Sequence, residues 1–315
     1  MKDKTSTKTN KFKNVIKIIS LIVLMIGIYY FIPKLGSFKY TFSVLKDASW
    51  FWLIIAFLAA IASFFSAGFT QFAAGNSTGS LIEITLVQTA GSFINHFLPF
   101  SLGGVNLISK YYLKKGRKQA EAIIMSMLPI IFGIITTVIT IAIISPITIT
   151  NYIDHVHKTH LNIWELVGLG AILIIIVILT LVFKNKIKNL LREALLGLKS
   201  ISDIKQLSYL ISGSLAITIT STLVLYASVK AIHQPADLIA VFTLYVTSAL
   251  VSNIAPTPGG LGATEAFLLV GLAATHLNLS QAAAVILIYR FFTFWLPILP
   301  GGLALHRVNK LKIVG

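Results

Sequence analysis

Two short segments of this chain carry polar residues, a proline and glycines in the same order inside apolar sequence. The first contains Asn95, His96, Pro99, Gly103 and Gly104. Asparagine and histidine side chains can hydrogen-bond a polar headgroup, whereas proline and glycine interrupt a helix. Broken backbone inside a membrane is tolerated only where protein or a water-filled cavity satisfies its polar groups. The segment therefore predicts a polar site at membrane depth.

The second segment repeats this order and continues into a short polar stretch. Its members are Asn253, Pro256, Pro258, Gly259, Gly260, Gly262, Thr264 and Glu265. Backbone amides converge in glycine-rich turns, and a helix that follows begins with partial positive charge. We expect helices to begin near Val105 and near Ala263, so that two helix N-termini point at one place and form an anion site. Alternatively, the glycines only permit close helix packing.

Arg290 is a charged residue deep inside a predicted span, about 15 Å from its start. An arginine at that depth costs roughly 2.5–3.5 kcal/mol on insertion scales, so it should face the protein interior and have a partner. Glu265 is the nearest candidate by topology. Arg290 either binds a phosphate bidentately or forms a structural bridge to Glu265. Similarly, Asn95, His96 and Asn253 either hydrogen-bond a headgroup or join neighbouring helices.

Signals for other chemistry are weak. The histidines that follow Asp154, namely His155, His157 and His160, suggest a metal site, but a polar external loop without a carboxylate cluster or cysteine is the better interpretation. The sequence has no Ser/His/Asp constellation, no Walker loop and no dinucleotide fingerprint. We therefore expect no catalytic residues, no metal, no cofactor and no ATPase that couples energy.

The composition indicates a polytopic membrane protein. Apolar residues make up 56% of the 315 positions and charged residues only 11%, whereas a soluble domain carries about 25% charged residues. The apolar residues fall in long blocks rather than in periodic stripes. The net charge of +16 does not indicate nucleic-acid binding, because the basic residues are confined to a few loops. The chain has no cysteine, which excludes disulfides and thiolate metal sites.

Six apolar blocks are long enough to cross a hydrocarbon core of about 30 Å. They cover residues 15–32, 51–73, 119–145, 164–183, 207–228 and 280–305. The first could suggest a signal peptide, but it is long and lacks a small-residue cleavage site, so we predict a retained span. Two further blocks, 84–113 and 238–276, contain the breaks, and their pieces are short. We predict re-entrant hairpins there; alternatively, the second block crosses the membrane twice.

The distribution of basic residues predicts the orientation. Twenty of the 26 lysines and arginines fall on one side of the predicted membrane and five on the other, with Arg290 inside. This bias places both termini in the cytoplasm of a multi-pass protein of the cell (plasma) membrane. The segment 185–206 is amphipathic and basic, which favours a helix on the cytoplasmic leaflet. A plain solvated connector is the alternative for that segment.

The two halves of the chain, 15–145 and 164–305, share one order of elements: span, span, broken hairpin, span. They have opposite topology, because the hairpins enter from opposite faces. Inverted repeats with discontinuous helices are typical of secondary transporters. We predict one all-α integral membrane domain, 1–315, with about six full transmembrane helices and two re-entrant broken-helix hairpins in an inverted repeat. Alternatively, proline and glycine are simply common in membrane helices.

These motifs resemble those of a known family. The stretch from Pro256 to Glu265 resembles the signature of the lysylphosphatidylglycerol synthase transmembrane family, also called the flippase-like family. The other similar stretches are Asn95 to Pro99 with Gly103 and Gly104, Tyr111 to Leu113, Tyr289 with Arg290, and Phe294 to Pro297. The similarity covers about residues 12–310. Two places differ from the family pattern: Val105 to Leu107, and Met127 to Pro129, where the family tends to carry acidic residues and arginine. We therefore expect a different headgroup preference.

The resemblance implies a membrane protein that handles lipid headgroups. In bifunctional members this region moves aminoacylated phosphatidylglycerol to the outer leaflet, which gives resistance to cationic peptides, and a separate soluble domain makes the lipid. This chain ends at Gly315, so we expect transport rather than synthesis. We expect anionic or aminoacylated phospholipids as partners, no nucleic acid, and a separate lipid-modifying synthase. The alternatives are a headgroup transferase with Glu265 or His96 as base, and a scaffold that does not transport.

Overall fold

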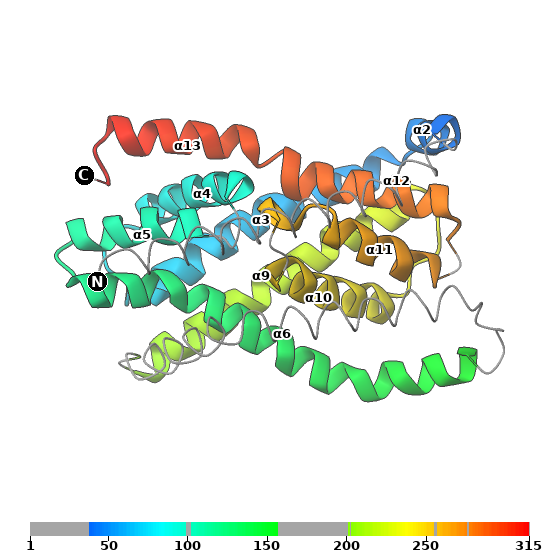
Figure 1. Cartoon of the computed structure of the whole chain (residues 1–315), viewed down its shortest axis with the longest axis horizontal. Helices are drawn as coiled ribbons and strands as arrows, with labels where there is room; N and C mark the ends of the chain where they lie inside the picture. Colours follow the sequence, from blue (N-terminus) through cyan, green and yellow to red (C-terminus); the bar gives the residue numbers. More distant parts are fainter. Residues whose placement is uncertain are drawn as a thin grey trace, which may run out of the picture.

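The structure, a computed structural model, describes residues 38–98, 102–156, 201, 203–254, 257–275 and 277–314, with the backbone alone at 38–40, 42, 102, 145–156, 253, 254 and 258. These residues form helices and short connections, and no strand occurs among them (Figure 1). The elements are α2 (Phe38–Lys46), α3 (Trp50–Ala74), α4 (Leu81–Phe97), α5 (Leu102–Lys114), α6 (Gln119–Val156), α9 (Ile204–Ala231), α10 (Leu238–Ile254), η3 (Pro258–Gly260), α11 (Ala263–Ala273), α12 (Leu279–Arg290), η4 (Phe291–Trp295) and α13 (Ile298–Lys310). The predicted all-α class is confirmed for this part of the chain.

Four of the described helical stretches are long and apolar enough to cross a membrane. They are α3, the first part of α6 (Gln119–Ile144), α9, and the continuous stretch Leu279–Lys310 that combines α12, η4 and α13. They coincide with the blocks predicted as spans at 51–73, 119–145, 207–228 and 280–305, each of which forms a long apolar helical stretch. The spans predicted at 15–32 and 164–183, and nearly all of the amphipathic segment 185–206, lie outside the described residues.

Between these spans lie two pairs of shorter helices. α4 packs against α5, and α10 packs against α11. The first pair is interrupted between Phe97 and Leu102 and the second between Ile254 and Ala263, where the sequence carries its proline and glycine residues. α11 has 11 residues and α4 has 17, so helices of this length rise only about 16–26 Å. Their re-entrant path through the membrane stays a prediction.

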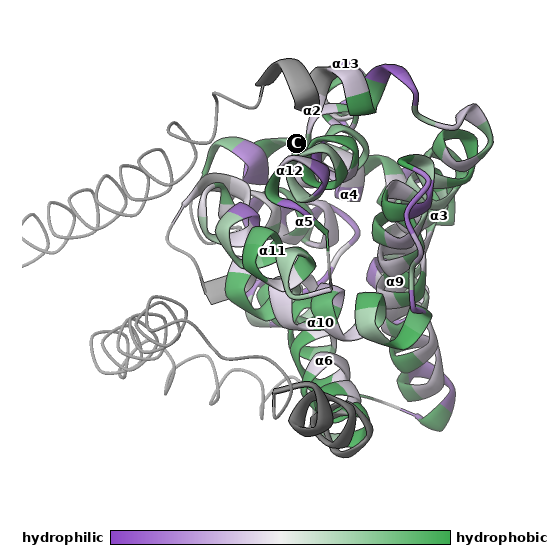
Figure 2. Cartoon of the chain, turned by 90° about the vertical axis from the view of Figure 1, so that its right-hand side faces the viewer, coloured by the Kyte–Doolittle hydropathy of each residue, from purple (hydrophilic) through white to green (hydrophobic). Residues whose placement is uncertain are grey.

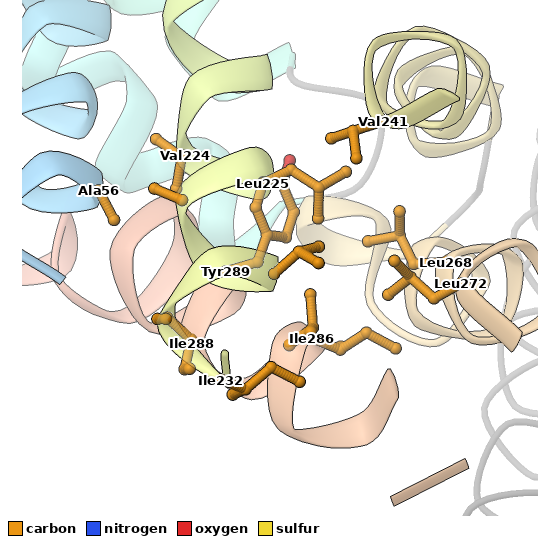
Figure 3. Close-up of a cluster of buried hydrophobic side chains, with 14 of the residues drawn as sticks. Ala56, Val224, Leu225, Ile232, Val241, Leu268, Leu272, Ile286, Ile288 and Tyr289 are labelled. Carbon is orange, nitrogen blue, oxygen red and sulfur yellow. The ribbon is translucent and has the colours of Figure 1, made fainter. Parts of the chain in front are cut away.

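The spans α3 and α9 pack closely against each other. Small residues let these helices approach closely, because a Cβ at Gly213 would stand 3.2 Å from the Cα of Thr70. The largest buried apolar cluster joins α9 to α11 and α12 through Leu225, Leu268 and Ile286 (Figure 3). Lipid tails are as apolar as leucine, so tight packing of this kind, rather than removal of side chains from water, holds membrane helices together.

Hydrophobic residues predominate on the helices (Figure 2), and many of their large apolar side chains are exposed. Large side chains stand exposed on three different spans: Phe65 is 65% exposed, Ile219 59% and Leu299 72%. A soluble protein rarely exposes contiguous apolar surface, because water would make it costly. This surface is suited to contact with lipid, as the predicted membrane protein requires.

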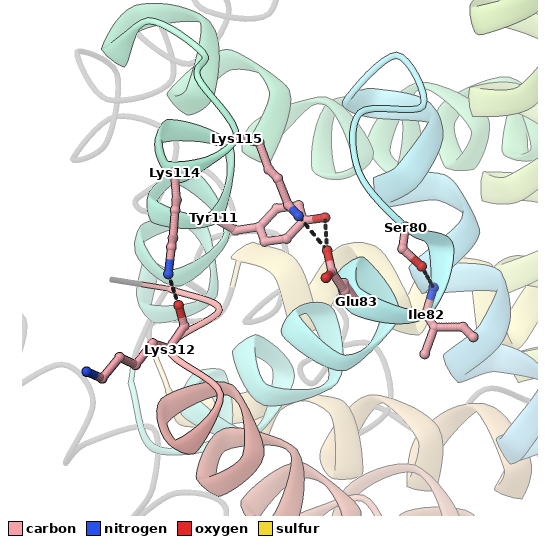
Figure 4. A network of polar contacts seen from close by, with 7 residues as sticks. All are labelled: Ser80, Ile82, Glu83, Tyr111, Lys114, Lys115 and Lys312. Carbon is pink, nitrogen blue, oxygen red and sulfur yellow. Dashed lines mark hydrogen bonds and ion pairs between the residues drawn. The ribbon is translucent and has the colours of Figure 1, made fainter.

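Charged contacts join the start of α4 to the end of α5 (Figure 4). The Lys115 Nζ lies 2.7 Å from the Glu83 Oε2, and the Tyr111 hydroxyl donates to the same oxygen at 3.3 Å. The hydrogen bond from Lys115 lowers the pKa of Glu83 below its usual value. Lys114 donates to the carbonyl of Lys312, which attaches the C-terminal stretch to the same helix pair. At the end of the α4–α5 pair that lies away from its break, polar contacts therefore join three segments: the start of α4, the end of α5 and the C-terminal stretch.

Replacing Gly91 of α4 by alanine should destabilise the protein. The added methyl group would stand 3.1 Å from the Gly104 Cα of α5, a backbone atom that cannot rotate away. We expect the free energy of unfolding to fall by about 1–3 kcal/mol, the usual cost of overpacking. Thermal unfolding of the purified protein in detergent measures this loss.

Gly133→Ala is the matched control for this prediction. No described atom lies within 4 Å of the methyl group that it adds, and alanine is the better helix former. Its unfolding temperature should stay unchanged or rise. Equal destabilisation by the two substitutions would contradict a close approach of α4 and α5 at Gly91.

Candidate functional site

The second break is a glycine turn that ends one helix and starts another inside the bundle. Gly259, Gly260 and Gly262 have φ angles of 59°, 69° and 86°, and the Gly260 amide donates to the Thr257 carbonyl at 3.2 Å. Backbone in this left-handed region is accessible to glycine without strain, which explains the glycine-rich sequence. The turn directs the first residues of α11, from Ala263 onward, into the interior.

Arg290, the last residue of α12, forms an ion pair at this turn. Its Nε lies 2.5 Å from the Glu265 Oε1, and its Nη2 donates to the Gly260 carbonyl at 3.5 Å. The other Glu265 oxygen accepts from the Gly262 amide at 2.7 Å. Both side chains are largely buried, with 11% and 15% of their area exposed. The predicted bridge between Arg290 and Glu265 is thus present in the structure, and phosphate binding by Arg290 stays a prediction.

Two buried hydroxyl groups near the start of α11 have no hydrogen-bond partner among the described residues. They belong to Thr257 and Thr264, which are 4% and 3% exposed. A Cβ at Gly260 would stand 2.9 Å from the Thr264 Oγ1, so this hydroxyl lies beside the turn that Arg290 contacts. A buried polar group without a partner costs about 1–3 kcal/mol. Anion binding at this turn stays a prediction.

The first break has a different and uncharged arrangement. The Asn95 Oδ1 accepts from the Gly104 amide at 2.7 Å, which ties the end of α4 to the first turn of α5. A Cβ at Gly103 or Gly104 would clash with side chains of α4. Of the two interpretations of Asn95, the structure shows it joining helices. Close packing likewise accounts for both glycines of this break.

His96 extends the first break toward the last span. Its Nδ1 lies 2.6 Å from the Ser92 carbonyl oxygen, which can only accept, so Nδ1 carries the hydrogen. The centroid of the His96 ring is 4.6 Å from that of Phe294 in η4. A Cβ at Gly259 of the second break would stand 2.5 Å from the same Phe294 ring. The two breaks therefore meet at one aromatic side chain.

The remaining predicted site residues are only partly described. Pro99 and Pro256 lie outside the described residues, and only the backbone of Asn253 and Pro258 is described. The stretch from Asp154 to His160 lies outside the part of the chain whose side chains are described. The described residues contain no group of three His, Cys, Asp or Glu side chains that could hold a metal.

The sequence interpretation did not include Phe294 and Thr257 among the site residues. The spacing held a signal for the first, because Phe294 lies four residues after Arg290 and so shares its helix face. The Thr257 position, between two prolines, gave no sign of its burial. The structure adds Thr257 to the candidate site because its hydroxyl is buried and has no hydrogen-bond partner among the described residues.

The chain matches one protein family over most of its length. Residues 17–301 match the model of the lysylphosphatidylglycerol synthase TM region. The chain belongs to this family. The family assigned from the motifs is thereby confirmed, and with it a membrane protein. A search of curated proteins gave no match.

Replacing Glu265 by glutamine should strongly destabilise this family member. Glutamine can still accept from the Gly262 amide, but it leaves the buried Arg290 charge without compensation. Breaking a buried pair by removing one partner costs about 3–5 kcal/mol, and we expect that loss in thermal unfolding. The double variant with Arg290→Gln has no uncompensated charge and should recover most of it.

Glu121→Gln serves as the control, because Glu121 is an exposed carboxylate in the first turn of α6. It should change the unfolding free energy by less than about 1 kcal/mol. If Glu265→Gln proves as mild as the control, or if the double variant is no better than the single one, the pair is not a stabilising unit.

Proposed function

We propose that this protein moves a phospholipid between the leaflets of the membrane without ATP, with the headgroup phosphate bound beside Arg290. The observation that carries the proposal is a buried ion pair set against a helix N-terminus and two unpaired hydroxyls, all within an apolar bundle. Phosphate oxygens accept hydrogen bonds from guanidinium, hydroxyl and amide donors alike. A phosphate here would give Thr257 and Thr264 the partner that the described residues do not supply.

The ion pair favours a headgroup that carries both charges. Arg290 is already neutralised by Glu265, so a purely anionic headgroup would compete with the carboxylate and leave it unpaired. A headgroup with an ammonium group beside its phosphate offers each side chain a new partner. Zwitterionic and aminoacylated phospholipids carry an ammonium group as well as a phosphate, whereas unmodified phosphatidylglycerol carries no ammonium group.

The family supports the same class of lipid. Its name refers to lysylphosphatidylglycerol, which carries a phosphate and amino groups. Outward movement of such a lipid would lower the negative charge of the outer surface of the plasma membrane and contribute to resistance to cationic peptides. A separate synthase would supply the lipid, and both termini would lie in the cytoplasm with it.

We further propose that the halves 15–145 and 164–305 act as an inverted repeat. Two features of the helix packing support this. The equivalent spans α3 and α9 pack on each other, and each broken pair contacts the last span of the other half: α13 packs on α4, and α6 packs on α10. Rocking of one half against the other would open the site to each leaflet in turn, while the acyl chains stay in lipid.

Reconstitution in liposomes tests the transport function. Dithionite reduces only those labels that reach the outer leaflet, so protein that moves lipid makes the inner-leaflet label accessible. With acyl-labelled lipids and no ATP, we expect phosphatidylethanolamine to move faster than phosphatidylglycerol. A new lipid species on chromatography would indicate a headgroup transferase instead. Failure to move or modify either lipid would favour a scaffold.

The charged pair can be tested separately from folding. Glu265→Gln combined with Arg290→Gln removes both charges and leaves no unpaired one, so the variant should fold yet move lipid at least about tenfold more slowly, in line with the loss of a charge-assisted contact of about 1.5–3 kcal/mol. Arg307→Gln is the matched control, because Arg307 is an exposed arginine on the same span. Equal rates for the double variant and the control would exclude the pair from headgroup binding.

A further inference from the structure

The ring of Phe294 lies against residues of both breaks. It is 6% exposed and belongs to the π-helical segment η4. The His96 ring at the end of α4 lies against it with 4.6 Å between centroids. On the second break, any Cβ at position 259 would stand 2.5 Å from the Phe294 Cε2. One side chain therefore contacts both the end of α4 and the turn that precedes α11, and these two segments also pack on each other.

The neighbours of this ring are held in place. Gly259 has a φ of 59°, a conformation that larger residues rarely adopt. The His96 imidazole is fixed by its hydrogen bond to the Ser92 carbonyl at 2.6 Å. Since the backbone turn and the imidazole are both constrained, rotation of the Phe294 side chain is the simplest way to open this contact.

The helix that carries Phe294 is built for local change. In η4 the Leu296 amide donates to the Phe291 carbonyl at 2.7 Å, five residues back, and Pro297 follows with no amide hydrogen. Such π segments are rare and often occur at functional sites. Before this segment α12 packs on α11, and after it α13 packs on α4. Movement between the two breaks would therefore bend the last span at η4.

We propose that Phe294 is the gate of the translocation path and limits the size of headgroup that crosses; this rests on the proposed function. The Arg290 Cζ lies 5.8 Å from the centroid of the Phe294 ring, within cation–π range. The gate therefore contacts the residue that binds the phosphate. A headgroup that moves from Arg290 toward His96 displaces the ring, and the phosphate replaces the ring as partner of the guanidinium. Binding and opening are linked in this way.

Changing the size of residue 294 tests the gate. The dithionite assay is run with acyl-labelled phosphatidylethanolamine and phosphatidylcholine, whose quaternary ammonium group is bulkier. We expect wild-type protein to move phosphatidylethanolamine faster, and Phe294→Ala to move both lipids at similar rates. Phe294→Trp should slow phosphatidylethanolamine by about tenfold, the effect of about 1.4 kcal/mol in the barrier.

Phe291→Ala is the matched control, because Phe291 lies in the same π segment but is 52% exposed. Its rates and their ratio should equal those of the wild type. If the alanine variant at position 294 does not fold, Phe294→Leu keeps an apolar side chain and should lower the selectivity in the same direction. An unchanged ratio in a folded alanine or leucine variant, with an active wild type, overturns the gate and leaves the transport function intact.

A second measurement does not depend on transport. The natural chain has no cysteine, so Thr257→Cys places a single thiol at a buried position of the second break. We expect a water-soluble maleimide to label this thiol about tenfold faster when Phe294 is replaced by alanine. Equal labelling in both backgrounds overturns the gate. If labelling accelerates but wild-type protein moves no lipid, the ring closes a path to the break and the proposed transport function is wrong.

Discussion

The arrangement of the second break depends on one constraint: a guanidinium inside an apolar bundle must have its charge compensated by the protein. Water is not available there to solvate it, and lipid cannot. Glu265 supplies the opposite charge at 2.5 Å, and the Gly260 carbonyl accepts a further hydrogen bond. The glycine turn brings both groups to Arg290, because it starts α11 beside the end of α12. The Glu265 carboxylate also accepts a hydrogen bond from the Gly262 amide. One side chain thus stabilises both the broken backbone and the Arg290 charge.

Each break joins two short helices, but an uncharged side chain stabilises the first break and a charged pair stabilises the second. In the first, a neutral amide side chain, Asn95, satisfies the Gly104 backbone. In the second, the corresponding task falls to a charged residue with a charged partner. The first turn of α5 continues with Val105, Asn106 and Leu107, which carry no charge. Any headgroup selection by charge in the described part of the chain is consequently concentrated on the side of Glu265 and Arg290.

Sequence reasoning could predict those features that depend on composition and on topology. Hydropathy located four long apolar helical stretches, and helix-breaking residues located both interruptions. The cost of a buried arginine indicated that Arg290 needs a partner, and topology indicated Glu265. Sequence reasoning could not assign Asn95, because a lone polar residue in a membrane helix looks the same whether it joins helices or binds a ligand. It also missed the π segment and the position of the Phe294 ring, which result from packing between elements distant in sequence.

The ion pair also bears on how a carrier without an energy source could complete a cycle. Such a carrier has to change conformation both with and without its lipid, and an uncompensated charge would oppose either step. When the site is empty, Arg290 and Glu265 neutralise each other. In the proposed cycle, the phosphate and ammonium group of a bound headgroup would pair with Arg290 and Glu265. For a zwitterionic headgroup, the net charge within the bundle would then be the same in both states, so neither the loaded nor the empty transition would carry an electrostatic penalty that the other avoids.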